Sequence, residues 1–260
     1  MTEIAPTSSA STVMAIERAA DVLSLFTEPG VDTLGVTEIA RALNLSKAVV
    51  YRVLTSFRLK GYIEIDTKTR RYRLGPGSLR LGMAYLNRTD VRTLARPAME
   101  HLSRAINETA TLSLRTGWTR TYIDQVTPNR DVKMVVTLGQ QAPLHAGSSS
   151  KAFLAFLSAD EQEEYLGETL EPLTAKTPTD PDVLRKEIAD IRDRGFSSSL
   201  GERLEGAASV AAPILGHDGR PVAVMSVCGP LERFRDEADE AARLLVEQTQ
   251  ALSRQFGYDA

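Results

Sequence analysis

The 260-residue sequence has little of what several classes of protein require. Its single cysteine, Cys228, permits no disulfide within the chain, which suits a reducing cytoplasm. The three histidines lie far apart without metal-site spacing, and we expect neither a metal nor any other cofactor. Apolar runs such as Val210 to Leu215 are too short to cross a bilayer. Residues 1–12 are polar and lack the features of a secretory signal, and we expect them to form a disordered tail. We therefore expect a cytoplasmic globular protein that makes no contact with membranes.

Charge is distributed unevenly along the chain. The formal net charge is −3, but the segment from Arg41 to Arg80 holds ten Lys/Arg and two Asp/Glu, a local net charge of +8. Residues 1–88 carry +4 and the remainder carries −7. A basic module attached to an acidic body is typical of a DNA-binding protein with a regulatory domain. An ordinary solvated basic face would have the same composition, so charge alone does not decide between them.

The segment from Val36 to Phe57 has the pattern of a helix-turn-helix, preceded by an amphipathic helix over 13–26. Ala40 is small enough for two helices to pack at a steep angle. Asn44 stands where the chain must reverse, and asparagine tolerates a left-handed backbone. Ser46 is a good N-cap for the second helix. We expect the outer face of this second helix to contact bases and phosphates through Ser46, Lys47, Ala48, Tyr51, Arg52, Thr55 and Ser56.

A basic hairpin is predicted directly after the second helix. Gly61–Asp66 and Arg71–Leu74 alternate with period two, as strands do, around a turn at Thr67–Arg70. We expect the cations of its tip, Lys68, Arg70 and Arg71, to follow the DNA backbone beside the helix as a wing. An ordinary hairpin with a solvated tip is the alternative, but it does not explain why the preceding helix also presents cations.

The residues from Val36 to Gly82, ending in RRYRLGPGSLRLG, resemble the winged helix-turn-helix and linker helix of the IclR family of bacterial transcriptional regulators. The resemblance implies a DNA-binding domain over 13–77 and a linker helix over 78–89. Gly75-Pro76-Gly77 predicts a break in the chain, after which Ser78 is positioned to cap the linker helix. We expect this helix to contact a second subunit; packing against its own domain is the alternative.

The remaining residues, 90–260, alternate between helical and strand periods. The pattern predicts helices over 91–107, 149–156, 160–166, 181–194 and 238–256, and strands over 109–114, 121–126, 132–138, 210–215 and 222–227. The last two strands flank His217-Asp218-Gly219, a strong turn signal. Helices over a largely antiparallel sheet indicate an α+β domain.

Two segments of this domain, Pro143 to Leu157 and Gly195 to Pro230, resemble the GAF-like effector-binding and oligomerisation domain of the same family. The resemblance implies a pocket for small carboxylates or related molecules. A helix N-terminus at Gly147–Ser150 also favours an anion by its own dipole and free N–H groups. Some family members hold Asp and Cys where this chain has Ser199 and Ser209, and the loss of a negative charge at these positions favours a pocket that recognises hydroxyl groups. The implied ligand contacts are Met134, Ser148, Ser149, Ser199 and Ser209.

A serine hydrolase is the alternative function. Ser148-Ser149-Ser150-Lys151 fits the Ser-x-x-Lys motif, in which Ser148 would be the nucleophile and Lys151 its base. The companion Ser-Asp-Asn and Lys-Thr-Gly elements are absent, and a short motif without its companions usually arises by chance. We therefore expect no catalytic residue.

The sequence as a whole predicts a ligand-responsive regulator that binds double-stranded operator DNA as a homodimer or homotetramer. A single small module contacts few phosphates, so pairing of two modules on a near-palindromic site is physically expected. The resemblance implies control of a catabolic operon for an aromatic or small organic acid.

Overall fold

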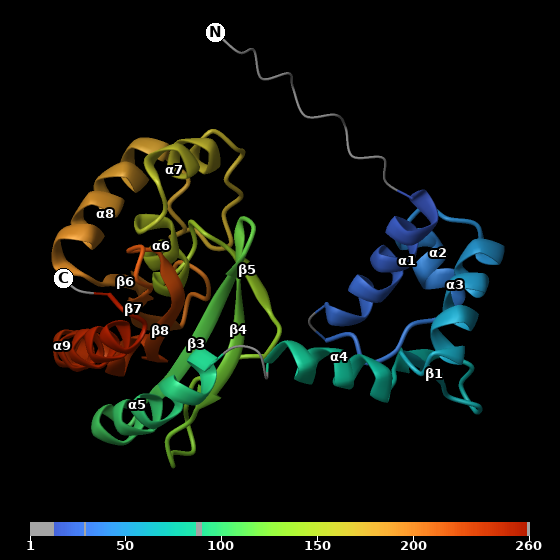
Figure 1. Ribbon diagram of the computed structural model, residues 1–260, viewed down its shortest axis with the longest axis horizontal. Coiled ribbons are helices and arrows are strands. Elements are labelled where there is room, and N and C mark those ends of the chain that lie inside the picture. Colours follow the sequence, from blue (N-terminus) through green and yellow to red (C-terminus); the bar gives the residue numbers. More distant parts are fainter. Residues whose placement is uncertain (1–12, 29, 87–89, 259–260) are drawn as a thin grey trace, which may run out of the picture. The chain divides into compact units, whose positions relative to one another are not determined.

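The chain forms two compact units, Met1–Tyr85 and Leu86–Ala260, in a computed structural model that describes residues 13–28, 30–86 and 90–258 (Figure 1). The predicted tail over 1–12 and the predicted linker positions 87–89 lie outside the described residues. Within the described ranges, no helix has the length and hydropathy that a membrane crossing requires.

The N-terminal unit is a helix-turn-helix followed by a small hairpin. A core of apolar side chains, including Val22, Phe26, Ile39, Val50 and Leu54, is buried between its helices and the hairpin. The predicted helix, helix-turn-helix and wing are all confirmed as elements. Their bounds are α1 Met14–Ser24, a 3-10 turn Leu25–Thr27, α2 Val36–Ala42, α3 Lys47–Leu59, β1 Ile63–Ile65, β2 Tyr72–Leu74 and α4 Pro76–Leu86.

Helix α4 begins at Pro76, so the break predicted over Gly75–Gly77 is confined to Gly75, and the predicted cap at Ser78 is wrong. Proline is tolerated in the first turn of a helix because its missing N–H has no partner there. The Ser78 hydroxyl instead donates to the Tyr62 carbonyl oxygen at 2.9 Å. A Cβ added at Gly77 would lie 2.7 Å from the Gly61 carbonyl oxygen, so this glycine permits close packing rather than a chain break.

The C-terminal unit is a six-stranded antiparallel sheet in the order β5-β4-β3-β8-β7-β6, with helices on both faces (Figure 1). The predicted α+β class is therefore confirmed. Its elements are α5 Asp90–Ile106, β3 Thr109–Thr116, β4 Thr119–Val126, β5 Gln141–Pro143, α6 Ser148–Ala155, α7 Ala159–Leu166, α8 Pro181–Arg194, β6 Ser197–Leu200, β7 Ala207–Leu215, β8 Pro221–Pro230 and α9 Leu231–Gln255.

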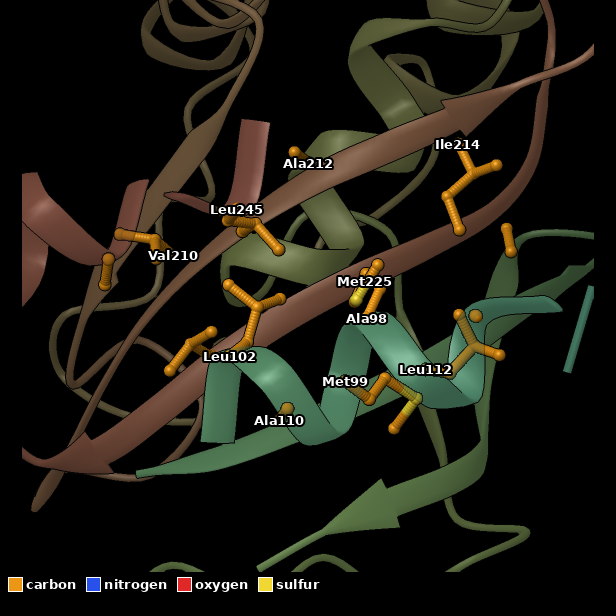
Figure 2. Close-up of a cluster of buried hydrophobic side chains, with 14 of the residues drawn as sticks. Ala98, Met99, Leu102, Ala110, Leu112, Val210, Ala212, Ile214, Met225 and Leu245 are labelled. Carbon is orange, nitrogen blue, oxygen red and sulfur yellow. The ribbon is translucent and has the colours of Figure 1, made fainter. Parts of the chain in front are cut away.

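Alternate residues of the central strands enter two separate cores. Val210, Ala212 and Ile214 of β7 pack with α5 and α9 on one face of the sheet, where Figure 2 shows Val210 and Ala212 beside Leu245. Residues between them, such as Ala211, enter the second core with α6, α7 and α8. This period of two is the ordinary consequence of strand geometry. The same alternation places Ser199 of β6 and Ser209 of β7 on the face of the sheet that carries α6.

Two predicted features of this unit differ from the structure, and two of its strands, β5 and β6, were not predicted. Residues 132–138 form no strand, because the side-chain amide of Gln125 on β4 takes the place of a strand partner and bonds both the N–H and the carbonyl of Val136, at 3.0 and 2.8 Å. Helix α9 begins at Leu231, seven residues before the predicted start. Strand β6 was not predicted, since its residues are a run of serines and a leucine without apolar alternation.

Candidate functional sites

Local interactions fix the angle between α2 and α3. Ala40 is buried at their contact, and Asn44 adopts the expected left-handed backbone with φ of +50°. The Leu45 N–H donates to the Ala40 carbonyl oxygen at 2.9 Å, which closes the turn. The Ser46 hydroxyl accepts from the Val49 N–H at 3.3 Å and so caps α3, as predicted.

The outer face of α3 carries the seven predicted DNA contacts. All are exposed except Thr55, which is half-buried. The hydroxyls of Thr55 and Ser56 donate to the carbonyl oxygens of Tyr51 and Arg52 at 2.8 and 3.0 Å, which leaves their oxygens able to accept hydrogen bonds. Tyr51 keeps 56% of its surface exposed although it is aromatic. A helix with this exposed polar and aromatic face can enter a groove of DNA.

The wing is held in shape by Asp66 and Arg71. The Asp66 carboxylate accepts from the N–H groups of Lys68 and Thr69 at 2.8 and 2.9 Å, and these bonds hold its pKa below the usual range. Arg70 completes the turn with φ of +59°. Lys68 and Arg70 are exposed at the tip, whereas the Arg71 guanidinium is half-buried and bonded to Glu38 of α2.

Most cations of the basic segment are unpaired. Among the described residues, only Arg71 with Glu38 and Arg73 with Glu64 form ion pairs within Arg41–Arg80. The other eight are exposed and have no carboxylate partner in the part of the chain that the structure describes: Arg41, Lys47, Arg52, Arg58, Lys60, Lys68, Arg70 and Arg80. Unpaired exposed cations can exchange their counterions for phosphates, which is the main source of affinity for DNA.

The C-terminal unit contains a partly enclosed cavity between the sheet and the start of α6, with about 450 Å³ of empty space when its opening to solvent is counted, of which about 30 Å³ can hold the centres of water molecules. Neighbouring strands supply its floor: Ser199 on β6 is paired with Ser209 on β7, which is paired in turn with Cys228 on β8. The five predicted ligand contacts, distant in the sequence, all line this one cavity: Met134, Ser148, Ser149, Ser199 and Ser209.

Helix α6 places its N-terminus at the cavity. It begins at Ser148 after Gly147, whose φ of +89° is a backbone conformation that favours glycine. The Ser148 and Ser209 hydroxyls are 2.7 Å apart and hydrogen-bonded across the cavity wall. The Gly147 N–H donates to the Glu202 carboxylate at 3.1 Å. A ligand in the cavity would therefore meet serine hydroxyls and the positive end of a helix dipole.

Sequence reasoning missed the two charged residues of the cavity, Arg120 and Arg203, and the tyrosine between them. The Arg120 guanidinium carbon lies 3.8 Å from the centre of the Tyr122 ring, and that of Arg203 lies 5.6 Å from it. Burial lowers the pKa of Arg120, and the positive charge of Arg203 lowers it further. The alternation of β4 would have placed Arg120 and Tyr122 on one face, but Arg203 follows a strand that was not predicted.

Cys228 is buried in β8 and lines the same cavity. Burial raises the pKa of its thiol to about 12, so the thiol is protonated at neutral pH. It contributes a compact, weakly polar surface to the cavity floor.

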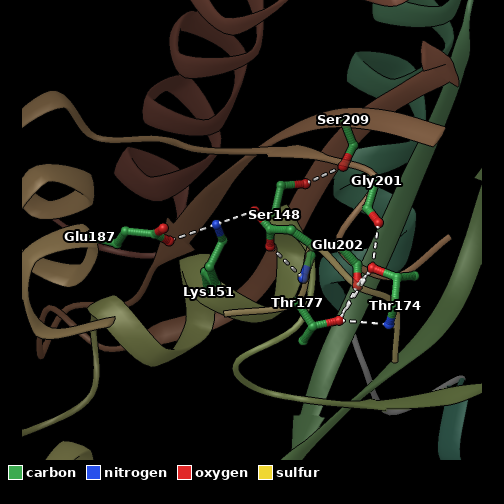
Figure 3. A network of polar contacts seen from close by, with 9 residues as sticks. Ser148, Lys151, Thr174, Thr177, Glu187, Gly201, Glu202 and Ser209 are labelled. Atoms are coloured by element: carbon green, nitrogen blue, oxygen red, sulfur yellow. Dashed lines mark hydrogen bonds and ion pairs between the residues drawn. The ribbon is translucent and has the colours of Figure 1, made fainter. Parts of the chain in front are cut away.

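Lys151, the proposed base of the hydrolase alternative, is committed to a buried ion-pair network. Its ammonium group lies 2.7 Å from Glu187 and 2.6 Å from Glu202 (Figure 3). The Ser148 hydroxyl is hydrogen-bonded to Ser209, and among the described residues no hydrogen bond joins it to Lys151, so the pair lacks the contact that a nucleophile and its base require. The geometry therefore argues against the hydrolase.

Comparison with known proteins agrees with both halves of this description. The IclR helix-turn-helix domain matches residues 15–67, and the bacterial transcriptional regulator IclR C-terminal domain matches residues 83–254. The chain belongs to the IclR family. This is a family of non-enzymatic, ligand-responsive DNA-binding regulators, and the curled antiparallel sheet of the C-terminal unit is its GAF-like effector domain.

Relatives match along nearly the full chain. The HTH-type transcriptional regulator BhcR of Paracoccus denitrificans is 33% identical, over 93% of this chain and 86% of its own. The glycerol operon regulatory protein of Streptomyces griseus is 31% identical, over 95% and 98%. An IclR homologue from Microbacterium hydrocarbonoxydans, solved in complex with 4-hydroxybenzoate, has the same fold at 22% identity, with a TM-score of 0.79 over 93% of this chain and 98% of its own.

Proposed function

We propose that this IclR-family regulator controls a catabolic operon for an aromatic or small organic acid, and that its effector binds in the cavity lined by Arg120, Ser148 and Ser209. The observation that carries the proposal is the convergence of all five predicted ligand contacts on one partly enclosed cavity. The glycerol operon regulatory protein among the relatives supports control of a catabolic operon. The homologue solved in complex with 4-hydroxybenzoate supports an organic acid as the effector.

The DNA-binding surface in this proposal is the outer face of α3 together with the wing tip. It comprises the ten predicted residues, of which Arg71 acts mainly by holding the wing through Glu38. We propose a DNA-binding domain over 13–77, a linker helix that the structure begins at Pro76, and an effector-binding domain over 90–260. Effector binding would change operator affinity by a coupling free energy of about 1–3 kcal/mol.

A second copy of the chain is proposed to cover the apolar face of α4. Leu79 and Met83 lie one helical turn apart and keep 65% and 42% of their surfaces exposed. Burying this face in a cytoplasmic homodimer or homotetramer would place two α3 helices on successive major grooves. Leu79→Glu should weaken self-association in sedimentation equilibrium; an unchanged oligomeric state would remove α4 from the interface.

A gel-shift titration against the chain's own promoter region tests the DNA surface. Arg52→Ala should weaken binding and lower the slope of log K against log[salt] by about one if Arg52 contacts a phosphate. Arg235→Ala, at an exposed arginine of α9, is the matched control and should bind as the native protein does. Unchanged binding by Arg52→Ala would exclude this residue from the interface.

A further inference from the structure

The charge of the effector cavity is not balanced by the protein. Among the described residues that line it, two are cationic, Arg120 and Arg203, and none is a carboxylate. Glu202 is adjacent in sequence, but its carboxylate oxygens bond Lys151 and the Gly147 N–H. The cavity therefore holds two positive charges, and no described residue that lines it supplies a negative charge to neutralise them.

Arg120 in particular has hydrogen-bonding capacity to spare. Only 2% of its surface is exposed, and its single hydrogen bond to a described side chain is from Nε to the Ser150 hydroxyl at 3.2 Å. Its Nη1 atom is buried without a partner. A buried guanidinium that lacks a carboxylate is costly in free energy unless a ligand supplies the missing acceptor.

Arg203 is presented to the cavity by a loop, residues 201–206, that is anchored by the side chains of Thr174 and Thr177. The Thr174 hydroxyl donates to the Gly201 carbonyl oxygen at 2.8 Å, and the Thr177 hydroxyl donates to the Glu202 carbonyl oxygen at 2.6 Å (Figure 3). In the described part of the chain, Arg203 has neither an ion pair nor a hydrogen bond of its own. The anchored loop thus fixes a cation at the cavity before a ligand arrives, which reduces the entropic cost of binding.

We propose that the effector is a dicarboxylate whose two negative charges are neutralised by Arg120 and Arg203. The inference rests on the proposed role of this cavity as the effector site and adds the charge of its ligand. Each guanidinium has the planar fork of N–H groups that matches one carboxylate. A monocarboxylate would leave one of the two cations of the cavity without a counter-charge, whereas the serine hydroxyls and the α6 N-terminus can serve the remaining carboxylate oxygens of a dicarboxylate.

Calorimetric titration of the full chain with matched pairs of probes tests the proposal. Each dicarboxylate (succinate, glutarate, adipate and terephthalate) is compared with its own half-amide, which has the same shape and one charge fewer. At least one dicarboxylate should bind ten-fold or more tightly than its half-amide. Equal or tighter binding by every half-amide, or no binding by any dicarboxylate, overturns the proposal.

Variants assign the preference to the two arginines. Arg203→Gln and Arg120→Gln should each reduce dicarboxylate affinity at least ten-fold and bring the ratio between dicarboxylate and half-amide close to one. Arg235→Gln, which removes an exposed arginine of α9, should leave both affinities unchanged. A ten-fold preference that survives both cavity variants overturns the assignment.

Two further measurements separate folding and DNA binding from ligand recognition. Arg120→Gln should melt at or above the temperature of the ligand-free native protein, because it removes an unsatisfied buried charge; if it does not fold, Arg203→Gln on the half-buried loop carries the test. Salt-sensitive binding to the promoter region is measured without ligand. If the native protein binds the promoter DNA but shows no preference for dicarboxylates, only this inference fails. If the native protein shows no salt-sensitive binding to the promoter DNA, the proposed function itself is refuted.

Discussion

The Arg71 guanidinium forms two parallel hydrogen bonds to the Glu38 carboxylate, from Nη1 at 3.0 Å and from Nη2 at 2.7 Å. Its Nε donates to the Thr33 hydroxyl at 2.8 Å. These bonds join the residue before β2 to the start of α2, and those from Arg71 to Glu38 hold the pKa of Glu38 below its usual range. The wing therefore has a set orientation relative to α3 before DNA is bound.

Arg71→Gln is expected to loosen the wing, whereas Arg70→Asn should remove only a DNA contact. Arg70 has φ of +59°, which asparagine tolerates, so its replacement should leave hydrogen exchange of the wing amides unchanged and lower the salt slope of DNA binding by about one. Arg71→Gln should speed that exchange and weaken DNA binding several-fold. If Arg71→Gln leaves exchange unchanged and alters only the salt slope, Arg71 is a DNA contact instead of a brace.

Gly77→Ala should destabilise the N-terminal unit by about 1–3 kcal/mol, because its new methyl group would lie 2.7 Å from the Gly61 carbonyl oxygen. Gly82→Ala in the same helix is the matched control, since nothing lies within 4 Å of its added Cβ. That control should be neutral or stabilise by up to about 1 kcal/mol. Amide hydrogen exchange in the full chain measures both, and equal effects of the two changes would contradict the packing argument.

Lys151→Met should destabilise the C-terminal unit by about 3 kcal/mol, because Glu202, whose side chain is only 12% exposed, then keeps its charge without its cation. Burial already raises the pKa of Glu202 even in the presence of Lys151. Urea unfolding is followed through Trp118, the only tryptophan of the chain, which lies in this unit. The double change Lys151→Met with Glu202→Gln should recover part of the loss, and a purely additive double variant would refute the coupling.

Stability of the C-terminal unit should fall as pH is lowered from about 7.5 through the ordinary histidine pKa of about 6.5. His145 is buried, with Nδ1 2.7 Å from the Tyr165 hydroxyl and Nε2 3.0 Å from the Glu171 carbonyl oxygen, and burial lowers its pKa. Below its ordinary pKa the unfolded chain takes up the proton first, so protons favour unfolding.

Urea midpoints measured between pH 5.5 and 8 check the role of His145. His145→Gln should flatten the profile, because glutamine can still donate to the Glu171 carbonyl oxygen without titrating. His101→Gln, at an exposed position of α5, should keep the native profile. Parallel profiles for the native protein and His145→Gln would assign the pH dependence to another group.

Features set by neighbours in the sequence were predictable. The helix-turn-helix follows from the small Ala40, the left-handed Asn44 and the capping Ser46, each of which acts within a few residues of itself. The bounds of α8, with Asp180 as its cap and Gly195 as its left-handed end, follow for the same reason. Resemblance to the IclR family supplied the serines of the cavity, which periodicity alone would have left as loop or cap residues.

Features that depend on distant partners were not predictable. Residues 132–138 have strand-like composition, but the Gln125 side chain satisfies the backbone of Val136, and a side chain that replaces a strand leaves no periodic signal. The pair of glycines at 75 and 77 is typical of a break between elements, yet both allow the chain to pack closely against the Gly61 carbonyl oxygen.

The sequence by itself determined the order of the elements, the position of the exposed cations and the two-unit plan, because alternation, capping and charge act over short stretches of chain. Only the tertiary structure decided that Arg71 holds the wing and that Arg120 and Arg203 share a cavity around Tyr122. Arg71 lies 33 positions from Glu38 in the sequence, and Arg203 lies 83 positions from Arg120. The packing of whole elements brings each pair together in the folded chain.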